Sequence, residues 1–364
     1  MDYQSLLTKY NDEMQVRTTL YKPEHLKAYD PIWYTPITFK QNHLQWMRGE
    51  KPVFAPMPTH GLDFAPYCIP DIVARHYLRE VTPPTAYPDI FYKDMFGVTW
   101  QFEPAAMGSM VKPGNPTVDE LEDWRDTIVL PDVDSWPWEE DGKLNECMKQ
   151  DEFSRKFWFF TGYFERLISW LDFENAAIAM IDEDYEDDVH DALDNITSTY
   201  EKIFPKCKQY FDPDIMYVHD DWGSQAQPFF SLDACQDILG PYLKRMVDCA
   251  HENGMLYEMH CCGHSDALVP VMVEAGVDTW DGQPMNDFGM VFDEWGDKIR
   301  VQAKIDVPTD DMTEQEIFDF CQNFLDRYST DSKWAAPSFR PIKNMHKMFY
   351  PIMYATSREF YATH

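Results

Sequence analysis

In the second half of the chain, short apolar runs alternate with longer segments whose apolar residues recur with the period of a helix. The apolar runs predict β-strands at 156–160, 214–219, 255–262, 277–280, 299–305 and 334–337. The intervening segments predict helices at 164–204, 231–253, 265–275, 287–296 and 313–328, and a last helix from residue 344. Strands and helices therefore take turns along this half of the chain.

Local signals set several of these boundaries. Ser231 is a good N-cap for its helix, and Gly254 ends it. Thr313 and Glu316 form a capping box at the start of another helix. The acidic run 182–188 interrupts the first helical segment. It is typical of a solvated helix start, because acidic residues favour helix N-termini, and a cation site is the alternative.

The alternation predicts parallel strands joined by right-handed helical crossovers. An open doubly wound sheet and a closed barrel both fit this order, but the Gly-rich phosphate turn usual in an open sheet is missing. Polar residues instead collect at the carboxyl ends of several strands, as Asp220, Asp221, His260, Cys262, Asp281, Gln283 and Asp306. Because barrels spread their sites over several strand ends, we expect an α/β protein with a (β/α)8 TIM barrel.

The first part of the chain has weaker periodicity. We expect residues 1–50 to form an N-terminal helical arm packed on a barrel that comprises residues 51–364. Within the barrel, 52–57 is the predicted first strand and 98–102 the second. Residues 112–150 lack a clear period but contain tryptophans that need burial, which indicates an excursion over the domain rather than a linker.

Composition narrows the classes of partner. The net charge of −32 repels phosphate backbones and anionic lipid headgroups, so nucleic acid and membrane surfaces are excluded as expected partners. No apolar run reaches the roughly 20 residues of a membrane helix, and the N-terminus shows no secretion signal. The cysteines are scattered along the chain and indicate reduced thiols, so we expect a cytoplasmic protein. A homodimer is a possible oligomeric state that the sequence does not decide.

The strand at 255–262 concentrates the most chemistry. Because strand residues alternate between faces, Glu258, His260 and Cys262 share one face. A carboxylate, an imidazole and a thiolate together are a zinc ligand set. The alternative is a buried histidine and cysteine packed inside a barrel, and the spacing alone does not decide between the two.

Further candidates follow the neighbouring strands. Asp220 and Asp221 end the strand at 214–219, and only one of them can face the barrel mouth. We expect Asp221 to be the acid or base there, with a helix-dipole partner as the alternative. Trp222 offers a ring for stacking. Asp281 and Gln283 end a later strand, where loop capping is the alternative role.

Four motifs occur in a characteristic order within residues 155–340. They are His-Asp-Asp-Trp-Gly-Ser-Gln at 219–225, Gly-Pro-Tyr-Leu-Lys-Arg at 240–245, His-Cys-Cys-Gly at 260–263, and Glu-Ala-Gly-Val-Asp-Thr-Trp-Asp-Gly-Gln at 274–283. With these motifs the chain resembles the uroporphyrinogen decarboxylase superfamily, whose members are (β/α)8 barrels. The resemblance is weak over residues 1–150.

The superfamily has two main branches. True decarboxylases bind substrate propionates with an arginine-rich N-terminal signature, but the corresponding residues 52–66 contain no arginine. Corrinoid-dependent methyltransferases hold zinc with a His-x-Cys-Gly strand and a later cysteine. His260, Cys262 and Gly263 match that strand, so the resemblance is closer to the methyltransferase branch.

The match to the branch is incomplete. Its third zinc ligand comes from the end of the last strand, here 335–341, which contains no Cys or His; Ser338 or Phe339 stands there. Cys321 is a poor substitute because it falls within a predicted helix. Either Glu258 supplies the third ligand or no metal binds, and we favour Glu258 because it shares the inward face.

The resemblance implies a zinc-assisted methyltransferase that moves a methyl group between a small substrate and the cobalt of a separate corrinoid protein. In this hypothesis His260 acts through the zinc, and either the metal or a proton from Asp221 stabilises the leaving oxygen. The aromatic content favours a methoxylated aromatic donor and O-demethylation, although a thiol acceptor activated by zinc is an alternative. The candidate substrate contacts are Trp222, Trp280, Gln283 and Phe339.

Two other functions remain as alternatives. One is a decarboxylase with a different carboxylate clamp, and the other is a non-catalytic relative that binds a tetrapyrrole or a corrinoid.

Overall fold

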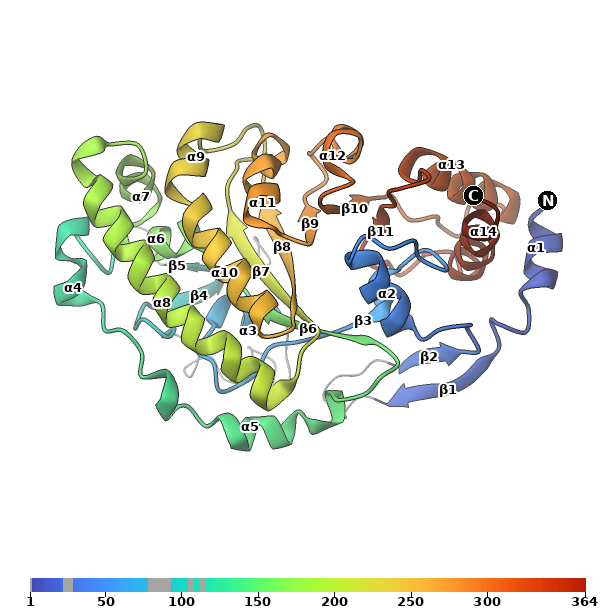
Figure 1. The fold of residues 1–364 in the computed structure, drawn as a ribbon, viewed down its shortest axis with the longest axis horizontal. Helices are drawn as coiled ribbons and strands as arrows, with labels where there is room; N and C mark the ends of the chain where they lie inside the picture. Colours follow the sequence, from blue (N-terminus) through green and yellow to red (C-terminus); the bar gives the residue numbers. More distant parts are fainter. Residues whose placement is uncertain (1, 22–28, 78–92, 104–107, 112–115) are drawn as a thin grey trace.

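A parallel β-sheet that curls around an interior forms the centre of the molecule (Figure 1). The structure is a computed structural model and describes residues 2–21, 29–77, 93–103, 108–111 and 116–364. Within these residues the sheet has seven strands in the order β11-β10-β9-β8-β7-β6-β3. The strands are β3 (Gly61–Phe64), β6 (Ser154–Phe159), β7 (Ile215–Asp221), β8 (Leu256–Cys262), β9 (Thr279–Gly282), β10 (Arg300–Lys304) and β11 (Ala336–Ser338).

All neighbouring strands of this sheet run parallel. Each of the six strands predicted in the second half of the chain is present, with small shifts at its ends. Helices between the strands lie on the outer side of the curled sheet (Figure 1). The fold is therefore α/β and TIM-barrel-like, which confirms the predicted class.

The helices of this part break more often than predicted. They are α6 (Phe164–Leu171), α7 (Phe173–Ala179), α8 (Glu186–Phe211), α9 (Leu232–Ile238), α10 (Gly240–Glu252), α11 (Val269–Ala275), α12 (Phe288–Trp295), α13 (Glu314–Tyr328) and α14 (Phe349–Thr363). The helix predicted at 164–204 breaks at Asp172, whose backbone takes a positive φ of 74° and whose side chain caps α7. The acidic run begins α8, as predicted for a solvated helix start.

The N-terminal arm is only partly helical. It contains α1 (Tyr3–Lys9) and α2 (Phe39–Met47), but β1 (Val16–Tyr21) and β2 (Tyr29–Trp33) pair antiparallel between them, which the prediction of a helical arm missed. The arm packs on the end of the chain, since the Tyr10 hydroxyl donates to Glu359 at 2.7 Å. The segment therefore has mixed secondary structure, and the division into an arm and a barrel stays a prediction.

The first barrel strand predicted at 52–57 does not form. Asn42 of α2 takes up the backbone of this segment: it donates to the Phe54 carbonyl at 2.8 Å and accepts from the Val53 N–H at 2.8 Å. The Ala55 N–H donates to Ser357 of α14 at 2.9 Å. Side chains of helices therefore satisfy groups that a neighbouring strand would otherwise pair.

The strand predicted at 98–102 lies outside the parallel sheet. It is β4 (Trp100–Glu103), which pairs antiparallel with β5 (Gly108–Val111) after the short helix α3 (Ile72–Tyr77). The excursion that follows carries α4 (Trp124–Thr127) and α5 (Trp138–Leu144) along α8 (Figure 1). Trp124 and Trp138 are buried there, as the excursion hypothesis requires.

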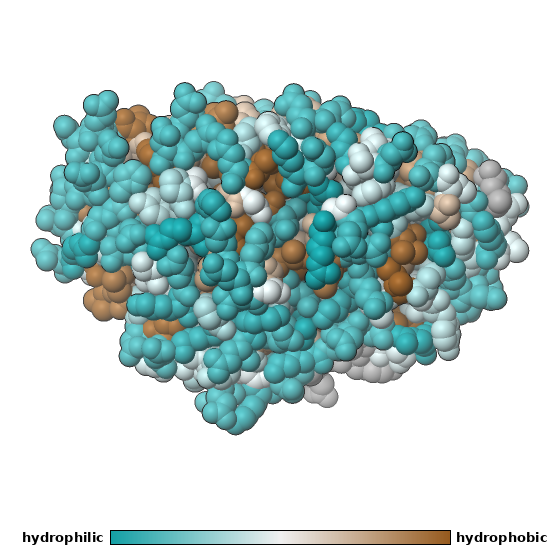
Figure 2. All heavy atoms as spheres, in the orientation of Figure 1, coloured by the Kyte–Doolittle hydropathy of each residue, from teal (hydrophilic) through white to brown (hydrophobic). Residues whose placement is uncertain are grey.

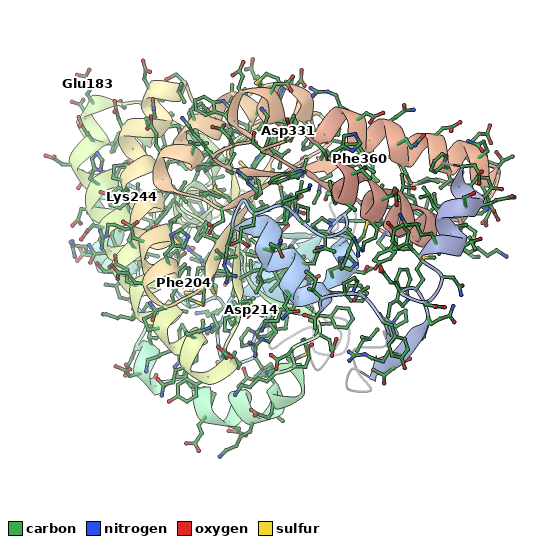
Figure 3. The ribbon with its side chains drawn as sticks, turned by 45° about the vertical axis from the view of Figure 1, so that its right-hand side comes forward. Glu183, Phe204, Asp214, Lys244, Asp331 and Phe360 are labelled. Carbon is green, nitrogen blue, oxygen red and sulfur yellow. The ribbon has the colours of Figure 1, made fainter. Side chains whose placement is uncertain are left out.

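The core lies inside the curled sheet and between the sheet and its helices. Phe204 of α8 packs against Phe159 of β6 with ring centroids 5.7 Å apart, whereas Glu183 and Lys244 project from the outside of the molecule (Figure 3). The visible face is largely hydrophilic, with a few apolar patches (Figure 2). Among the described residues, no helix combines the length and the apolar character that crossing a membrane requires.

Candidate functional site

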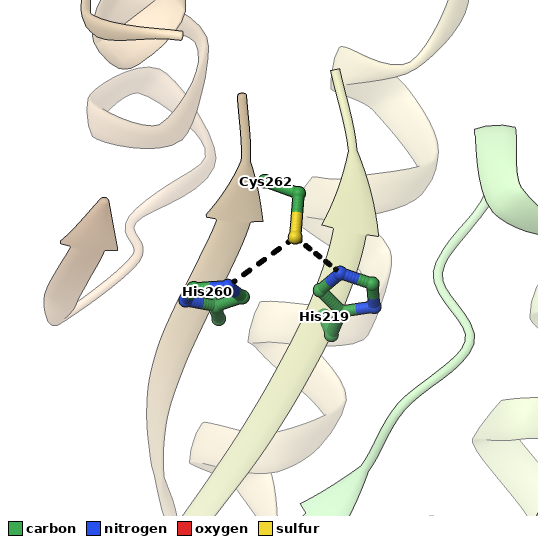
Figure 4. A group of neighbouring side chains, drawn as sticks. All are labelled: His219, His260 and Cys262. Atoms are coloured by element: carbon green, nitrogen blue, oxygen red, sulfur yellow. Dashed lines mark hydrogen bonds between the residues drawn. The ribbon is translucent and has the colours of Figure 1, made fainter. Parts of the chain in front are cut away.

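Strands β7 and β8 bring a cysteine and two histidines together at their carboxyl ends. The register places His219 opposite His260 and Asp221 opposite Cys262. The Cys262 sulfur lies 3.2 Å from His219 Nε2 and 3.5 Å from His260 Nε2 (Figure 4). The three ligand atoms all lie within 4.8 Å of one another. Because parallel strands end at the same rim of a barrel, this cluster lies where TIM-barrel enzymes place their sites.

The other ring nitrogen of each histidine faces an acceptor. His219 Nδ1 lies 3.2 Å from the Phe160 carbonyl and 2.9 Å from a Glu165 oxygen. His260 Nδ1 lies 3.1 Å from Asp281 Oδ2. A carbonyl or carboxylate can only accept, so each Nδ1 carries a hydrogen, and when the ring is neutral its Nε2 lone pair is available to a metal ion beside Cys262. Metal-binding histidines are oriented in this way.

The electrostatics of the cluster favour added positive charge. Burial by itself lowers the pKa of both imidazoles, but Glu165 and Cys262 outweigh it at His219, whose pKa lies well above the usual value. At His260, Cys262 and Asp281 likewise outweigh burial and raise the pKa to about 9. Burial also raises the pKa of Glu165 to about 7. Such a pocket is stabilised by protons or by a cation.

The donor set fits a zinc ion. With ordinary Zn–N and Zn–S bonds, two ligands at tetrahedral angles lie about 3.6 Å apart, close to the two sulfur–nitrogen distances here. Asp221 Oδ1 is buried 3.0 Å from His219 Nε2, and it lacks a hydrogen-bond donor when that nitrogen carries no hydrogen, as in a metal-bound ring. An orphaned carboxylate oxygen beside two imidazoles and a thiol is what a cation site leaves open.

Glu258, which we expected to be the third ligand, does not belong to this cluster. Its Oε1 accepts from Lys156 Nζ at 2.7 Å and from Gln302 Nε2 at 2.6 Å, in the interior below the site. It shares the inward face of β8, but it lies four residues before Cys262, which is too far along the strand. The third member of the cluster is His219, a neighbour across the sheet.

The two aspartates at the carboxyl end of β7 point in different directions. Asp220 caps the start of α6, where its carboxylate accepts from the backbone N–H groups of Tyr163, Phe164 and Glu165 at 2.8 to 3.1 Å. Asp221 instead lies beside His219. The structure therefore places Asp221 in the site, where we predicted the acid or base to be, and leaves Asp220 a structural role.

Three predicted substrate contacts are core residues. Trp222 is fully buried and donates to Asp220 at 3.0 Å. Trp280 is fully buried against Phe288, with ring centroids 5.2 Å apart. Phe339 packs against α14. The structure therefore places these rings in the core, and their contact with a substrate stays a prediction.

Gln283 does reach the site, as a neighbour of the thiol. Its Nε2 lies 3.1 Å from the Cys262 sulfur, and its Oε1 accepts from the Gly263 N–H at 3.0 Å. Asp281, from the same segment, contacts His260. Loop capping was the alternative for both residues, and the structure places both beside the candidate ligands.

Two residues of the site were missed by the sequence reasoning, His219 and Glu165. A signal existed for His219: it alternates with Tyr217 and Asp221 on β7 just as His260 alternates with Cys262 on β8. Reading the inward faces of the two strands together would have included it. Glu165 lies on α6 and carried no comparable signal, because its contact with His219 depends on how that helix packs.

Comparisons with known proteins add one informative likeness. No family model matches the chain, and no curated protein matches its sequence. Among solved structures, a methyltransferase from Methanosarcina mazei is similar over 90% of this chain and 99% of its own, with a TM-score of 0.56 and 14% sequence identity. A sugar phosphate isomerase/epimerase from Parabacteroides distasonis reaches a TM-score of only 0.30 at 9% identity, over 69% of this chain and 97% of its own. The first likeness shows a shared fold, and the superfamily resemblance stays a prediction.

Proposed function

We propose that this protein transfers a methyl group from a small donor, best a methoxylated aromatic, to the reduced cobalt of a corrinoid on a partner protein. His219, His260 and Cys262 would hold a zinc ion for this reaction. The observation that carries the proposal is the convergence of two Nε2 atoms and one sulfur at the barrel rim. The fold shared with a methyltransferase and the motif order at 219–283 support it.

The ligand set favours an ether as the methyl donor. Two neutral imidazoles and one thiolate supply a single negative charge. A bound zinc ion would keep a net charge of about +1 and would act as a Lewis acid on the ether oxygen. The same charge disfavours a thiol as methyl acceptor, because a thiolate becomes less nucleophilic as its pKa is lowered.

Asp221 is the residue that would handle the proton. When the methyl carbon leaves oxygen for cobalt, the oxygen keeps both electrons of the broken bond and needs a proton. The Asp221 side chain is 37% exposed and lies 3.0 Å from His219. Burial raises the pKa of Asp221, but the effect of His219 is larger and in the opposite direction. The net pKa is below the usual value, so the carboxyl is ionised at neutral pH. We therefore assign Asp221 the role of a relay that takes a proton from solvent and passes it on.

A zinc assay and an anaerobic demethylation screen test the proposal. The purified protein should contain about one zinc ion per chain. With a reduced corrinoid protein and a set of methoxylated aromatics, the cobalt absorbance should change only in the presence of zinc-loaded protein.

Substitutions separate the two parts of the proposal. His260→Ala should lose both zinc and methyl transfer, whereas His251→Ala on α10, which removes an imidazole that contacts Asp278 and not the cluster, should keep both. Methyl transfer by zinc-free protein would contradict the role of the metal. Zinc binding with no transfer from any donor would contradict the reaction.

A further inference from the structure

We infer that Asp281 is a positioning residue, which aims His260 at the candidate metal centre. This inference rests on the metal site of the proposed function. Asp281 lies on β9 directly opposite His260 on β8, and its Oδ2 lies 3.1 Å from His260 Nδ1. The contact holds the hydrogen on Nδ1 and turns Nε2 toward the Cys262 sulfur, 3.5 Å away.

Asp281 is itself held from three other strands. The Tyr217 hydroxyl of β7 donates to Oδ2 at 2.7 Å. On the opposite oxygen, Lys304 of β10 donates at 2.5 Å and Ser338 of β11 at 3.4 Å. The carboxylate has almost no freedom to rotate, because both of its oxygens are occupied and its side chain is only 10% exposed. Lys304 also balances its charge inside the barrel.

This assembly gives a role to the strand end where the expected ligand is missing. Ser338 stands at the carboxyl end of β11, and its hydroxyl accepts from Lys304 at 2.8 Å. A serine hydroxyl is a poor zinc ligand but a good hydrogen-bonding group. The last strand therefore supports His260 through Asp281 and Lys304, while β7 supplies the extra candidate ligand, His219.

The two candidate histidines differ in how they are supported. His260 has only Asp281 at its Nδ1 among the described residues. His219 has the Phe160 carbonyl at 3.2 Å in addition to Glu165, and a backbone carbonyl survives every side-chain substitution. Removing the charge of Asp281 should therefore disturb zinc binding more than the same change at Glu165.

The test compares Asp281→Asn with Glu165→Gln, two matched changes of carboxylate to amide beside a histidine Nδ1. Zinc affinity is measured by competition with a chelator, and Co²⁺ substitution reports thiolate ligation through its charge-transfer band. Asp281→Asn should weaken zinc binding about 10- to 100-fold. Glu165→Gln should have a clearly smaller effect. Unchanged affinity in Asp281→Asn, or an equal loss in Glu165→Gln, would overturn the inference.

Further variants separate positioning from folding. Tyr217→Phe removes one donor to Asp281 without leaving a charge unpaired, and should weaken zinc binding by a smaller factor than Asp281→Asn. Glu258→Gln alters a buried carboxylate on the same strand as His260 that contacts Lys156 instead, so it should leave zinc affinity unchanged even if it lowers the unfolding temperature. A drop in affinity in Glu258→Gln equal to that in Asp281→Asn would mean that general destabilisation is the cause.

The outcome also distinguishes this inference from the proposed function. If the wild-type protein binds zinc tightly and Asp281→Asn binds it equally well, the positioning role fails and the metal site stands. If the wild-type protein binds no zinc, both fail.

Discussion

Two pairs of histidines lie at opposite ends of the barrel and have opposite electrostatics. His219 and His260 lie at the carboxyl ends of the strands, beside carboxylates and a thiol. His43 and His60 lie at the amino ends, where His43 contacts Ser154 at 2.7 Å and His60 stacks on Phe39 at 4.3 Å. His43, His60 and His219 are buried and the His260 side chain is 16% exposed, but the larger difference lies in their neighbours.

The comparison shows that neighbouring charges decide the state of a buried histidine. Burial lowers the pKa of His60 to about 3 and that of His43 well below its usual value, so both rings are neutral parts of the core. The same burial acts on His260, yet Cys262 and Asp281 raise its pKa to about 9. In TIM barrels the carboxyl ends serve function and the amino ends serve stability, and the two pairs follow that division.

The largest effect should follow from breaking the ligand set at the carboxyl end. Cys262→Ser replaces a thiolate by a weak ligand and should lower zinc affinity by about two orders of magnitude or more, with loss of methyl transfer. Zinc content after dialysis and the cobalt absorbance assay measure both. Cys249→Ser on α10 is the matched control and should retain zinc. Full zinc content in Cys262→Ser would show that the Cys262 thiolate is not a zinc ligand.

A substitution of Asp221 tests whether methyl transfer can be lost while zinc stays bound. Asp221→Asn keeps the shape of the side chain but cannot relay a proton, so kcat for demethylation should fall roughly 10²- to 10⁴-fold while zinc stays bound. Steady-state kinetics and zinc analysis of the same preparation give the answer. Loss of zinc together with activity would make Asp221 a ligand instead, and an unchanged kcat would exclude both roles.

The histidines at the amino end should make the protein sensitive to acid. Their pKa is about 6.5 when unfolded and is depressed by folding, so their contribution to stability is complete above that pH. For His60 it is lost as the pH falls from about 6.5 toward 3, by about 1.4 kcal/mol per pH unit, and His43 adds a loss in the same direction. Urea unfolding of metal-free protein at a series of pH values measures the slope.

His60→Gln provides the control for this slope. In the wild type, His60 Nδ1 accepts a hydrogen bond from the Met57 N–H at 3.1 Å. Glutamine can still accept this hydrogen bond but cannot take up a proton. The variant should lose stability at neutral pH and show a shallower pH dependence than the wild type. An identical slope would show that other groups cause the acid sensitivity.

The smallest effect should come from the aromatic residues that the structure moves into the core. Trp222→Phe removes the hydrogen bond to Asp220 and part of a buried ring, and should lower the free energy of unfolding by about 1 to 3 kcal/mol. Because Trp222 is fully buried, KM for the methyl donor should not change. A large rise in KM would restore Trp222 as a substrate contact.

Residues close together in the sequence determined the strands and helices in the second half of the chain. The apolar runs of the six later strands and the caps at Ser231 and Thr313 depend on residues a few positions apart, so the sequence alone was enough to predict them. Their alternation also determined the parallel, TIM-barrel-like class. His260 and Cys262 were found in the same way, because the period of a strand places them on one face.

Only the tertiary structure decided which side chains meet across strands. His219 and Cys262 are separated by two helices in sequence, and their 3.2 Å contact depends on the register between β7 and β8. The alternation of residues along a strand could not separate Glu258 from His260. It shows which face of the strand a side chain is on, but not how close that side chain lies to the carboxyl end of the barrel. Nor could it show that Asn42 and Ser357 would satisfy the segment at 52–57, since those hydrogen bonds join elements far apart in the chain.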